Sequence, residues 1–214
     1  MPGAKKRVGI LISGRGSNMA SLIDAAQRPD YPAEIAVVVS NRPGAGGLAR
    51  AEAAGIRTAV VDHKLFPDRA SFDAALGQAF DAAGADLICL AGFMRILTDG
   101  FVQGRLGRML NIHPSLLPSF KGLHPHRQAL DAGVRIHGCT VHFVVPELDS
   151  GPIIAQAAVA VLPEDTDDAL GARVLAEEHR LYPLGLELVA GGQARLEGGR
   201  TVFSDPGRTA LGLA

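Results

Sequence analysis

The chain has 214 residues, enough for one α/β domain with a sizeable core. Its 21 lysines and arginines nearly balance 22 aspartates and glutamates, and no basic stretch alternates with aromatic residues, which argues against nucleic acid or an anionic membrane as a partner. The first apolar run, Val8 to Ile12, is too short for a signal peptide or a membrane span, so we expect a cytoplasmic protein. In that compartment, reduced thiols are a simpler interpretation of Cys89 and Cys139 than a disulfide.

Short apolar segments alternate with segments of helical spacing through the first half of the chain. The pattern predicts a buried strand at 8–13, then a glycine-rich turn and a helix with Met19, Leu22 and Ile23 on its inner face. Further strands are predicted at 35–39, 58–61, 86–91 and 109–112, with helices after the second and, over 66–83, after the third. Because each strand is apolar throughout, we predict a mostly parallel, Rossmann-like α/β sheet with helices on both faces.

The pattern changes after Pro118. Residues 139–145 and 153–161 are predicted to be longer strands with no helix between them, which indicates a mixed edge to the sheet. Thr166 is suited to cap a helix that runs to about Tyr182, and the last twenty residues are predicted to form a short hairpin and a frayed tail. No convincing linker interrupts the chain, so we predict a single domain over residues 1–214, with a tail at 203–214.

The turn Ser13-Gly-Arg-Gly-Ser-Asn18 joins the first strand to the first helix. Glycines permit a tight turn, and the free N–H groups of a helix start favour an anion. An NAD or FAD site would need a third glycine, where this sequence has Met19, and an acidic residue at the end of the second strand, where it has Ser40 and Asn41. A Walker loop would need Gly-Lys-Ser/Thr, which is absent here. The turn therefore matches neither kind of site. The remaining functional interpretation is a monophosphate held by Gly16, Ser17 and Asn18, and the structural alternative is a turn capped by Ser17 or Asn18.

Two polar side chains, Asn111 and His113, stand at the carboxyl end of the fifth predicted strand, where α/β sheets bind ligands. Strand alternation places both on one side. If Asp149 in the later loop 145–152 approaches His113, its charge favours a protonated imidazole. An imidazolium beside a carboxamide can stabilise the oxyanion that forms when an amine attacks a carbonyl. The structural alternatives are a histidine without a catalytic role and an aspartate that caps a turn.

A metal site is a further possibility because the chain has seven histidines. His124-Pro-His126 puts two rings on a loop or helix start, but no His-Glu-x-x-His or Cys-x-x-Cys accompanies them. We therefore expect no metal.

Three segments in this order resemble the folate-dependent glycinamide ribonucleotide formyltransferases. They are Ile12–Asn18, Asn111–Pro118 with Phe120–Gly122, and Leu148–Pro152, within a similarity that runs from about Arg7 to Glu197. The resemblance implies transfer of a formyl group from 10-formyltetrahydrofolate to the amine of glycinamide ribonucleotide, the third step of purine biosynthesis. It also implies a nucleotide-substrate half over about 7–105 and a folate-binding and catalytic half over about 106–200.

The resemblance further implies roles for individual residues. Asn111 and His113 would stabilise the tetrahedral intermediate, with His113 as the general acid and Asp149 keeping it protonated. Contacts to glycinamide ribonucleotide would come from Gly16, Ser17, Asn18 and, at the ribose hydroxyls, Glu178. Contacts to the folate would come from Arg69, Met94, Arg95, Ile96, Leu97, Asn111, Val145, Pro146, Glu147, Leu148 and Asp149.

Other interpretations stay open at this point. Without the resemblance, Met94, Ile96 and Leu97 would be core residues, and Arg69 and Glu178 would lie on solvated helix faces. A formyltetrahydrofolate deformylase would deliver the formyl group to water, and a non-catalytic nucleotide or folate sensor would keep the pocket and need no acid. The sequence leaves the oligomeric state open.

Overall fold

The structure is a computed structural model, and it describes residues 4–213. Within these residues, seven strands form one sheet and two more form a separate hairpin. The sheet has the order β3-β2-β1-β4-β5-β6-β7. Its first five strands are parallel to their neighbours, whereas β6 and β7 are antiparallel, so the predicted sheet with a mixed edge is confirmed. The strands are β1 (Lys6–Ile12), β2 (Ala33–Ser40), β3 (Thr58–Val60), β4 (Leu87–Leu90), β5 (Met109–His113), β6 (Ile136–Phe143), β7 (Ile153–Ala160), β8 (Ala194–Glu197) and β9 (Arg200–Phe203).

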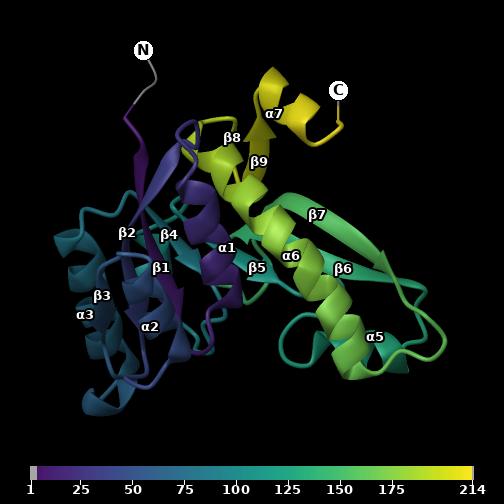
Figure 1. Ribbon diagram of the computed structural model, residues 1–214, viewed down its shortest axis with the longest axis horizontal. Coiled ribbons are helices and arrows are strands. Elements are labelled where there is room, and N and C mark those ends of the chain that lie inside the picture. The colour runs from purple at the N-terminus through teal and green to yellow at the C-terminus, as the bar shows by residue number, and fades with distance from the viewer. Residues whose placement is uncertain (1–3, 214) are drawn as a thin grey trace.

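Helices cover both faces of the sheet (Figure 1). One face packs on α1 (Ser17–Ala26), α2 (Gly46–Ala53), α5 (Pro125–Asp131) and α6 (Asp167–Ala190). The other packs on α3 (Arg69–Ala82) and α4 (Asp99–Gln103), with a 3-10 turn, η1 (His63–Leu65), before α3. A separate hydrophobic core lies on each face of the sheet: the first beneath α1, α2, α5 and α6, the second beneath α3 and α4. Because successive side chains of a strand point to opposite faces, Ile10 and Ile12 belong to the first core and Leu11 to the second.

The strand order places the candidate site. From β1 the chain winds outwards through β2 to β3, then crosses to β4 and β5 on the other side. Between β1 and β4, therefore, the loops that follow the two strands run in opposite directions, and they leave a crevice at the carboxyl ends of these strands. The glycine turn after β1, the loop after β4 and the end of β5 therefore face one region.

Helix α6 is longer than predicted. Thr166 caps it by accepting a hydrogen bond from the Ala169 N–H at 3.2 Å, as expected. The helix continues past Pro183 to Ala190, however, so the predicted end near Tyr182 is wrong. Proline lacks an N–H and normally ends a helix. Here Leu186 and Leu188 continue the buried face, and their packing outweighs the lost hydrogen bond.

Two other helix boundaries differ from prediction. Helix α3 begins at Arg69, because the Asp68 carboxylate accepts the Ser71 N–H at 2.7 Å and leaves Phe66 outside. The predicted hairpin near the C-terminus is confirmed as β8–β9, but the expected frayed tail is wrong for α7 (Asp205–Ala210). Ser204 caps α7 by accepting the Gly207 N–H. Within the described residues, no helix is long and apolar enough to cross a membrane, and both cysteines are free and buried.

Candidate active site

The glycine turn leads from β1 into α1. Gly16 adopts the left-handed conformation at φ 70° and is itself the N-cap of α1, so the alternative of a turn capped by Ser17 or Asn18 is wrong. The turn packs against the start of α2, where the Gly47 N–H donates to the Gly14 carbonyl at 3.0 Å. No side chain caps α1, and its first turn has no acidic residue. The N-terminus of α1 therefore keeps its preference for an anion.

A buried polar pair joins α1 to α6. The Asn18 side-chain amide donates to the Glu178 carboxylate at 2.8 Å, and both residues are buried. Burial raises the pKa of Glu178 to about 7, although the hydrogen bond from Asn18 acts in the opposite direction. The side-chain oxygen Oδ1 of Asn18 is buried without a hydrogen-bond partner in the described residues. Two sequence-predicted substrate residues thus lie in contact.

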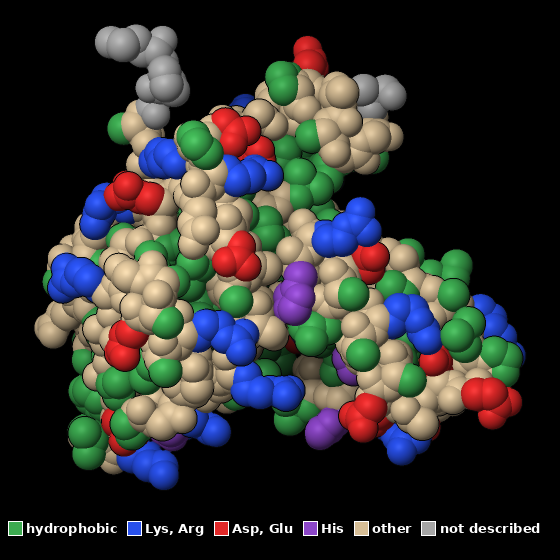
Figure 2. Space-filling model, in the orientation of Figure 1, with side chains coloured by type: hydrophobic (Ala, Val, Ile, Leu, Met, Phe, Trp, Pro, Cys, Tyr) green, Lys and Arg blue, Asp and Glu red, His purple; other side chains and the backbone are tan. Residues whose placement is uncertain are grey.

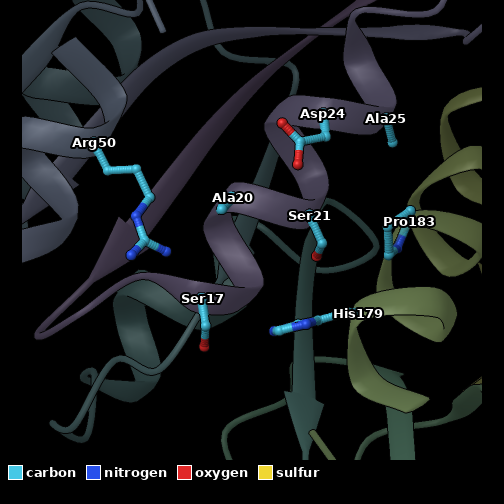
Figure 3. Close-up of a pocket in the computed structure, with 8 residues that line it drawn as sticks. All are labelled: Ser17, Ala20, Ser21, Asp24, Ala25, Arg50, His179 and Pro183. Atoms are coloured by element: carbon cyan, nitrogen blue, oxygen red, sulfur yellow. The ribbon is translucent and has the colours of Figure 1, made fainter. Parts of the chain in front are cut away.

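A groove of about 440 Å³ runs along α1 between α2 and α6 (Figure 3). In this view Ser17 at the start of α1 and His179 of α6 lie at its lower end, and Arg50 lines the side towards α2. Arg50 forms no ion pair or side-chain hydrogen bond within residues 4–213. Figure 2 shows basic side chains and a histidine around the hollow near the middle of this face. The groove is lined by Ser17, Ala20, Ser21, Asp24, Ala25, Arg50, His179 and Pro183, and so does not include Asn111, His113 or Asp149.

The predicted approach of His113 to Asp149 is present. His113 Nδ1 lies 3.4 Å from Asp149 Oδ2, and both side chains are buried. His113 Nε2 lies 3.0 Å from the Phe120 carbonyl oxygen, which can only accept a hydrogen bond. The ring therefore lies between two acceptors, and an imidazolium with N–H groups on both nitrogens satisfies both of them.

The backbone around this pair is held in an unusual conformation. Asp149 and Phe120 have φ angles of 48° and 57°, in the left-handed region that non-glycine residues seldom occupy. The Gly122 N–H donates to Asp149 Oδ2 at 2.9 Å and so ties the two loops together. Strained backbone of this kind concentrates at functional sites.

Asn111 joins the cluster through a residue that the sequence reasoning missed. Its amide Nδ2 lies 3.2 Å from Nε2 of His142, the residue directly opposite on β6. The pKa of His142 is lowered, chiefly by burial, although its hydrogen bond to the Phe143 carbonyl and the nearby Asp149 carboxylate act in the opposite direction; His113 lowers it further. Because both His113 and Asp149 act electrostatically on His142, the half-buried Asn111 belongs to the same polar cluster as the buried His113–Asp149 pair. The antiparallel register between β5 and β6 was the missing signal, and it cannot be read from the sequence alone.

The predicted folate residues divide into exposed and buried sets. Met94, Ile96 and Leu148 are large apolar side chains that are 66%, 59% and 53% exposed. The exposed Arg95 guanidinium lies 5.8 Å from the Phe72 ring centroid, and Arg69 is exposed at the start of α3. Leu97 is buried in the second core, and its contact with the folate stays a prediction.

The remaining predicted folate residues belong to the loop after β6. The side chains of Val145 and Pro146 are half-buried, whereas Glu147 is exposed and lies 3.7 Å from Lys121. The Met94 N–H donates to the Ser13 hydroxyl at 2.9 Å, which ties the loop after β4 to the end of β1.

Histidines beside the site pair with each other. His126 Nδ1 lies 3.2 Å from His137 Nε2, and the His137 ring meets the Phe120 ring edge-on. Burial and the neighbouring His126 lower the pKa of His137 to about 4. Within residues 4–213, no group of three or more His, Cys, Asp or Glu side chains is arranged to hold a metal ion.

Known proteins resemble this chain over most of its length. Residues 6–186 match the family model described as formyl transferase. A phosphoribosylglycinamide formyltransferase of Escherichia coli is 46% identical over 87% of this chain and 88% of its own. A crystal structure of glycinamide ribonucleotide transformylase 1 from Symbiobacterium toebii superposes with a TM-score of 0.92 at 48% identity, covering 95% and 96% of the two chains.

A longer relative also matches. The trifunctional purine biosynthetic protein adenosine-3 of Bos taurus is 52% identical over 92% of this chain. This chain spans 20% of the length of that protein.

Proposed function

The chain belongs to the formyl transferase family, and on that premise we propose that it transfers the formyl group of 10-formyltetrahydrofolate to the amine of glycinamide ribonucleotide, the third step of de novo purine biosynthesis. The observation that carries the proposal is the buried His113–Asp149 pair beside Asn111, at the carboxyl end of β5. This arrangement suits an acyl transfer in which no covalent intermediate with the protein is needed.

The reaction uses the cluster as follows. The substrate amine attacks the formyl carbon, and negative charge develops on the formyl oxygen. N–H groups of His113 and Asn111 stabilise that charge. When the intermediate collapses, the attached amine loses a proton to solvent and the bond from carbon to the folate nitrogen breaks. His113 acts as the general acid that gives its own proton to this nitrogen, and the neutral ring is protonated again from solvent. Asp149 stabilises the imidazolium and fixes the orientation of the ring.

The Phe120 carbonyl competes for the same proton. In this structure it accepts the Nε2–H of His113, so a formyl oxygen must share or replace that acceptor. Phe120 has a left-handed φ of 57°, which makes its conformation costly to hold. A small rotation of this peptide would release the N–H towards the substrate.

The groove between α1, α2 and α6 suits the phosphorylated end of the substrate. The uncapped N-terminus of α1 and the unpaired Arg50 both attract a phosphate. Glu178, buried beside Asn18, would accept hydrogen bonds from ribose hydroxyls. The exposed apolar side chains of Met94, Ile96 and Leu148 would contact the folate ring system, and Arg69 and Arg95 its carboxylates.

One assay separates this function from its rivals. Purified protein is given 10-formyltetrahydrofolate with and without glycinamide ribonucleotide, and the folate product is followed by absorbance. Turnover that requires the amine supports the transferase. Equal turnover without the amine would identify a deformylase, and binding of both compounds without turnover would identify a sensor.

A further inference from the structure

A buried histidine that has no part in the proton transfer lies against the Asn111 amide. His142 is the penultimate residue of β6 and is 2% exposed. It lies directly opposite Asn111 across the antiparallel β5–β6 pair, so the two side chains share one face of the sheet. The register between β6 and β7 shifts between Val141 and His142, and bulges of this kind commonly re-aim a side chain beside an active site.

The hydrogen bonds of His142 define its tautomer. Nδ1 lies 2.9 Å from the Phe143 carbonyl oxygen, which has no proton to give, so Nδ1 carries the N–H. In the neutral ring Nε2 is then an acceptor. Nε2 lies 3.2 Å from Asn111 Nδ2, and the amide N–H therefore donates to it.

This contact selects one of the two flip states of the Asn111 amide. In the observed state one Nδ2–H is held by His142, and the second is free to donate to a substrate oxygen. In the flipped state Oδ1 would face the lone pair of Nε2, and two acceptors would repel each other. The flipped amide would also present an oxygen, instead of a donor, to the developing oxyanion.

We propose that His142 is a positioning residue, which, as a neutral Nδ1–H tautomer, holds the Asn111 amide in the orientation that donates to the oxyanion. The expected effect on kcat rests on the proposed function. The tautomer of His142 and its hydrogen bond with Asn111 rest on the geometry alone.

Two features keep the ring in this state. Burial lowers the pKa of His142 and so favours the neutral form. The hydrogen bond to the Phe143 carbonyl and the charge of Asp149 oppose this effect, His113 adds to it, and the pKa is lowered on balance. Gly151 packs directly against the Phe143 carbonyl, because it has no side chain there: a Cβ atom on residue 151 would collide with the carbonyl oxygen. A glycine is therefore required beside the acceptor of the Nδ1–H.

The kinetic test uses two replacements of His142. His142→Phe keeps an aromatic ring and removes the acceptor, so kcat should fall by roughly tenfold, less than the ~10²-fold expected for loss of a whole oxyanion donor. KM for both substrates should change by less than about twofold, because neither substrate touches His142. His142→Gln places an amide oxygen where it can accept from Asn111, and should restore kcat to within about threefold of the parent.

A double variant distinguishes positioning from a general packing defect. In the Asn111→Ala background, His142→Phe should have no further effect on kcat, because no amide remains to be oriented. A kcat that falls by the product of the two single effects would overturn the proposal, as would a folded His142→Phe variant with the parent kcat. His137→Phe, in the same strand, gives the stability cost of exchanging a buried histidine for phenylalanine.

A spectroscopic test needs no turnover. In protein labelled with ¹⁵N-histidine, His142 should show a protonated, pyrrole-type Nδ1 and a pyridine-type Nε2 near neutral pH. The Nε2 signal should shift in Asn111→Ala. A protonated Nε2 would overturn the proposal even in an active enzyme. If the parent shows the expected tautomer but no amine-dependent turnover, the proposed function fails and the assignment of the hydrogen bond stands.

Discussion

A single buried acid makes the stability of the protein depend on pH. The raised pKa of Glu178, about 7, means that the folded protein holds a proton that the unfolded chain loses near pH 4.5. Below pH 4.5 the carboxyl group is protonated in both states. Between pH 4.5 and about 7 the unfolded chain ionises first, so the free energy of unfolding falls as pH rises.

Glu178→Gln removes this titration and keeps an oxygen that can accept from Asn18. As pH rises from 4.5 to 8, the unfolding free energy of the variant minus that of the parent should therefore increase, by up to about 3 kcal/mol. Urea denaturation at the two pH values measures the difference. A difference in unfolding free energy that stays constant with pH would show that Glu178 ionises normally in the folded state.

The role of His113 is also decided at the level of one residue. His113→Asn retains polarity but cannot act as an acid, so kcat should fall by ~10²-fold or more while the circular dichroism spectrum is unchanged. Steady-state kinetics with saturating substrates provides the measurement. A folded variant that turns over at the parent rate would remove His113 from the mechanism.

Among the elements, helix α6 packs closely against the sheet at a glycine. A Cβ atom on Gly185 would lie 2.7 Å from Cγ1 of Val141 on β6, inside van der Waals contact. Gly185→Ala should therefore lower the unfolding free energy by about 1–3 kcal/mol through overpacking, minus up to ~1 kcal/mol from the better helix propensity of alanine.

Shortening Val141 tests this cause. In Gly185→Ala/Val141→Ala, the added methyl group occupies the space that the valine vacates, so the pair should be at least ~1 kcal/mol more stable than the sum of the single effects predicts. Thermal or urea unfolding of all four proteins completes the cycle. Additive losses would mean that the two residues do not compete for the same space.

The groove formed by α1, α2 and α6 gives a second test at this scale. Arg50→Gln removes an unpaired guanidinium beside Ser17, so KM for glycinamide ribonucleotide should rise about tenfold with little change in kcat. Arg57→Gln is the matched control, because it removes an exposed charge that does not line the groove. The same substrate without its phosphate should bind the parent and Arg50→Gln equally. If Arg50→Gln weakened binding of the phosphorylated and the unphosphorylated substrate to the same extent, a contact between Arg50 and the phosphate would be contradicted.

At the scale of the whole molecule, the C-terminal elements lie apart from the chemistry. Figure 1 shows β8, β9 and α7 at the end of the molecule where β1 begins, whereas the glycine turn and the last residues of β5, which include Asn111, lie at the opposite, carboxyl ends of the strands. The family match also ends at residue 186. These elements add a small apolar contact, since Phe203 and Leu211 pack against the main core.

Removing residues 205–214 should therefore leave kcat and both KM values within about twofold of the parent, while the melting temperature falls. Activity assays and a thermal melt on the shortened protein would measure both effects. A large rise in KM for either substrate would place α7 at the active site.

Local patterns predicted much of this molecule. Uninterrupted apolar runs identified the buried strands, because a strand covered on both faces has no polar side. The positions of Asn111 and His113 at a strand end followed from the same pattern. Where packing competes with local preference, sequence reasoning failed: Pro183 does not end α6, because the buried face of the helix continues beyond it.

The sequence by itself determined the fold class, the strand ends that form the crevice and the chemical groups available there, because these depend on local hydrophobic periodicity and residue type. Only the tertiary structure decided which groups meet. The His113–Asp149 pair, the His142–Asn111 contact and the Asn18–Glu178 pair join residues that are 36, 31 and 160 positions apart. Strand register and helix packing fix such distances, and neither is encoded in any short segment of the chain.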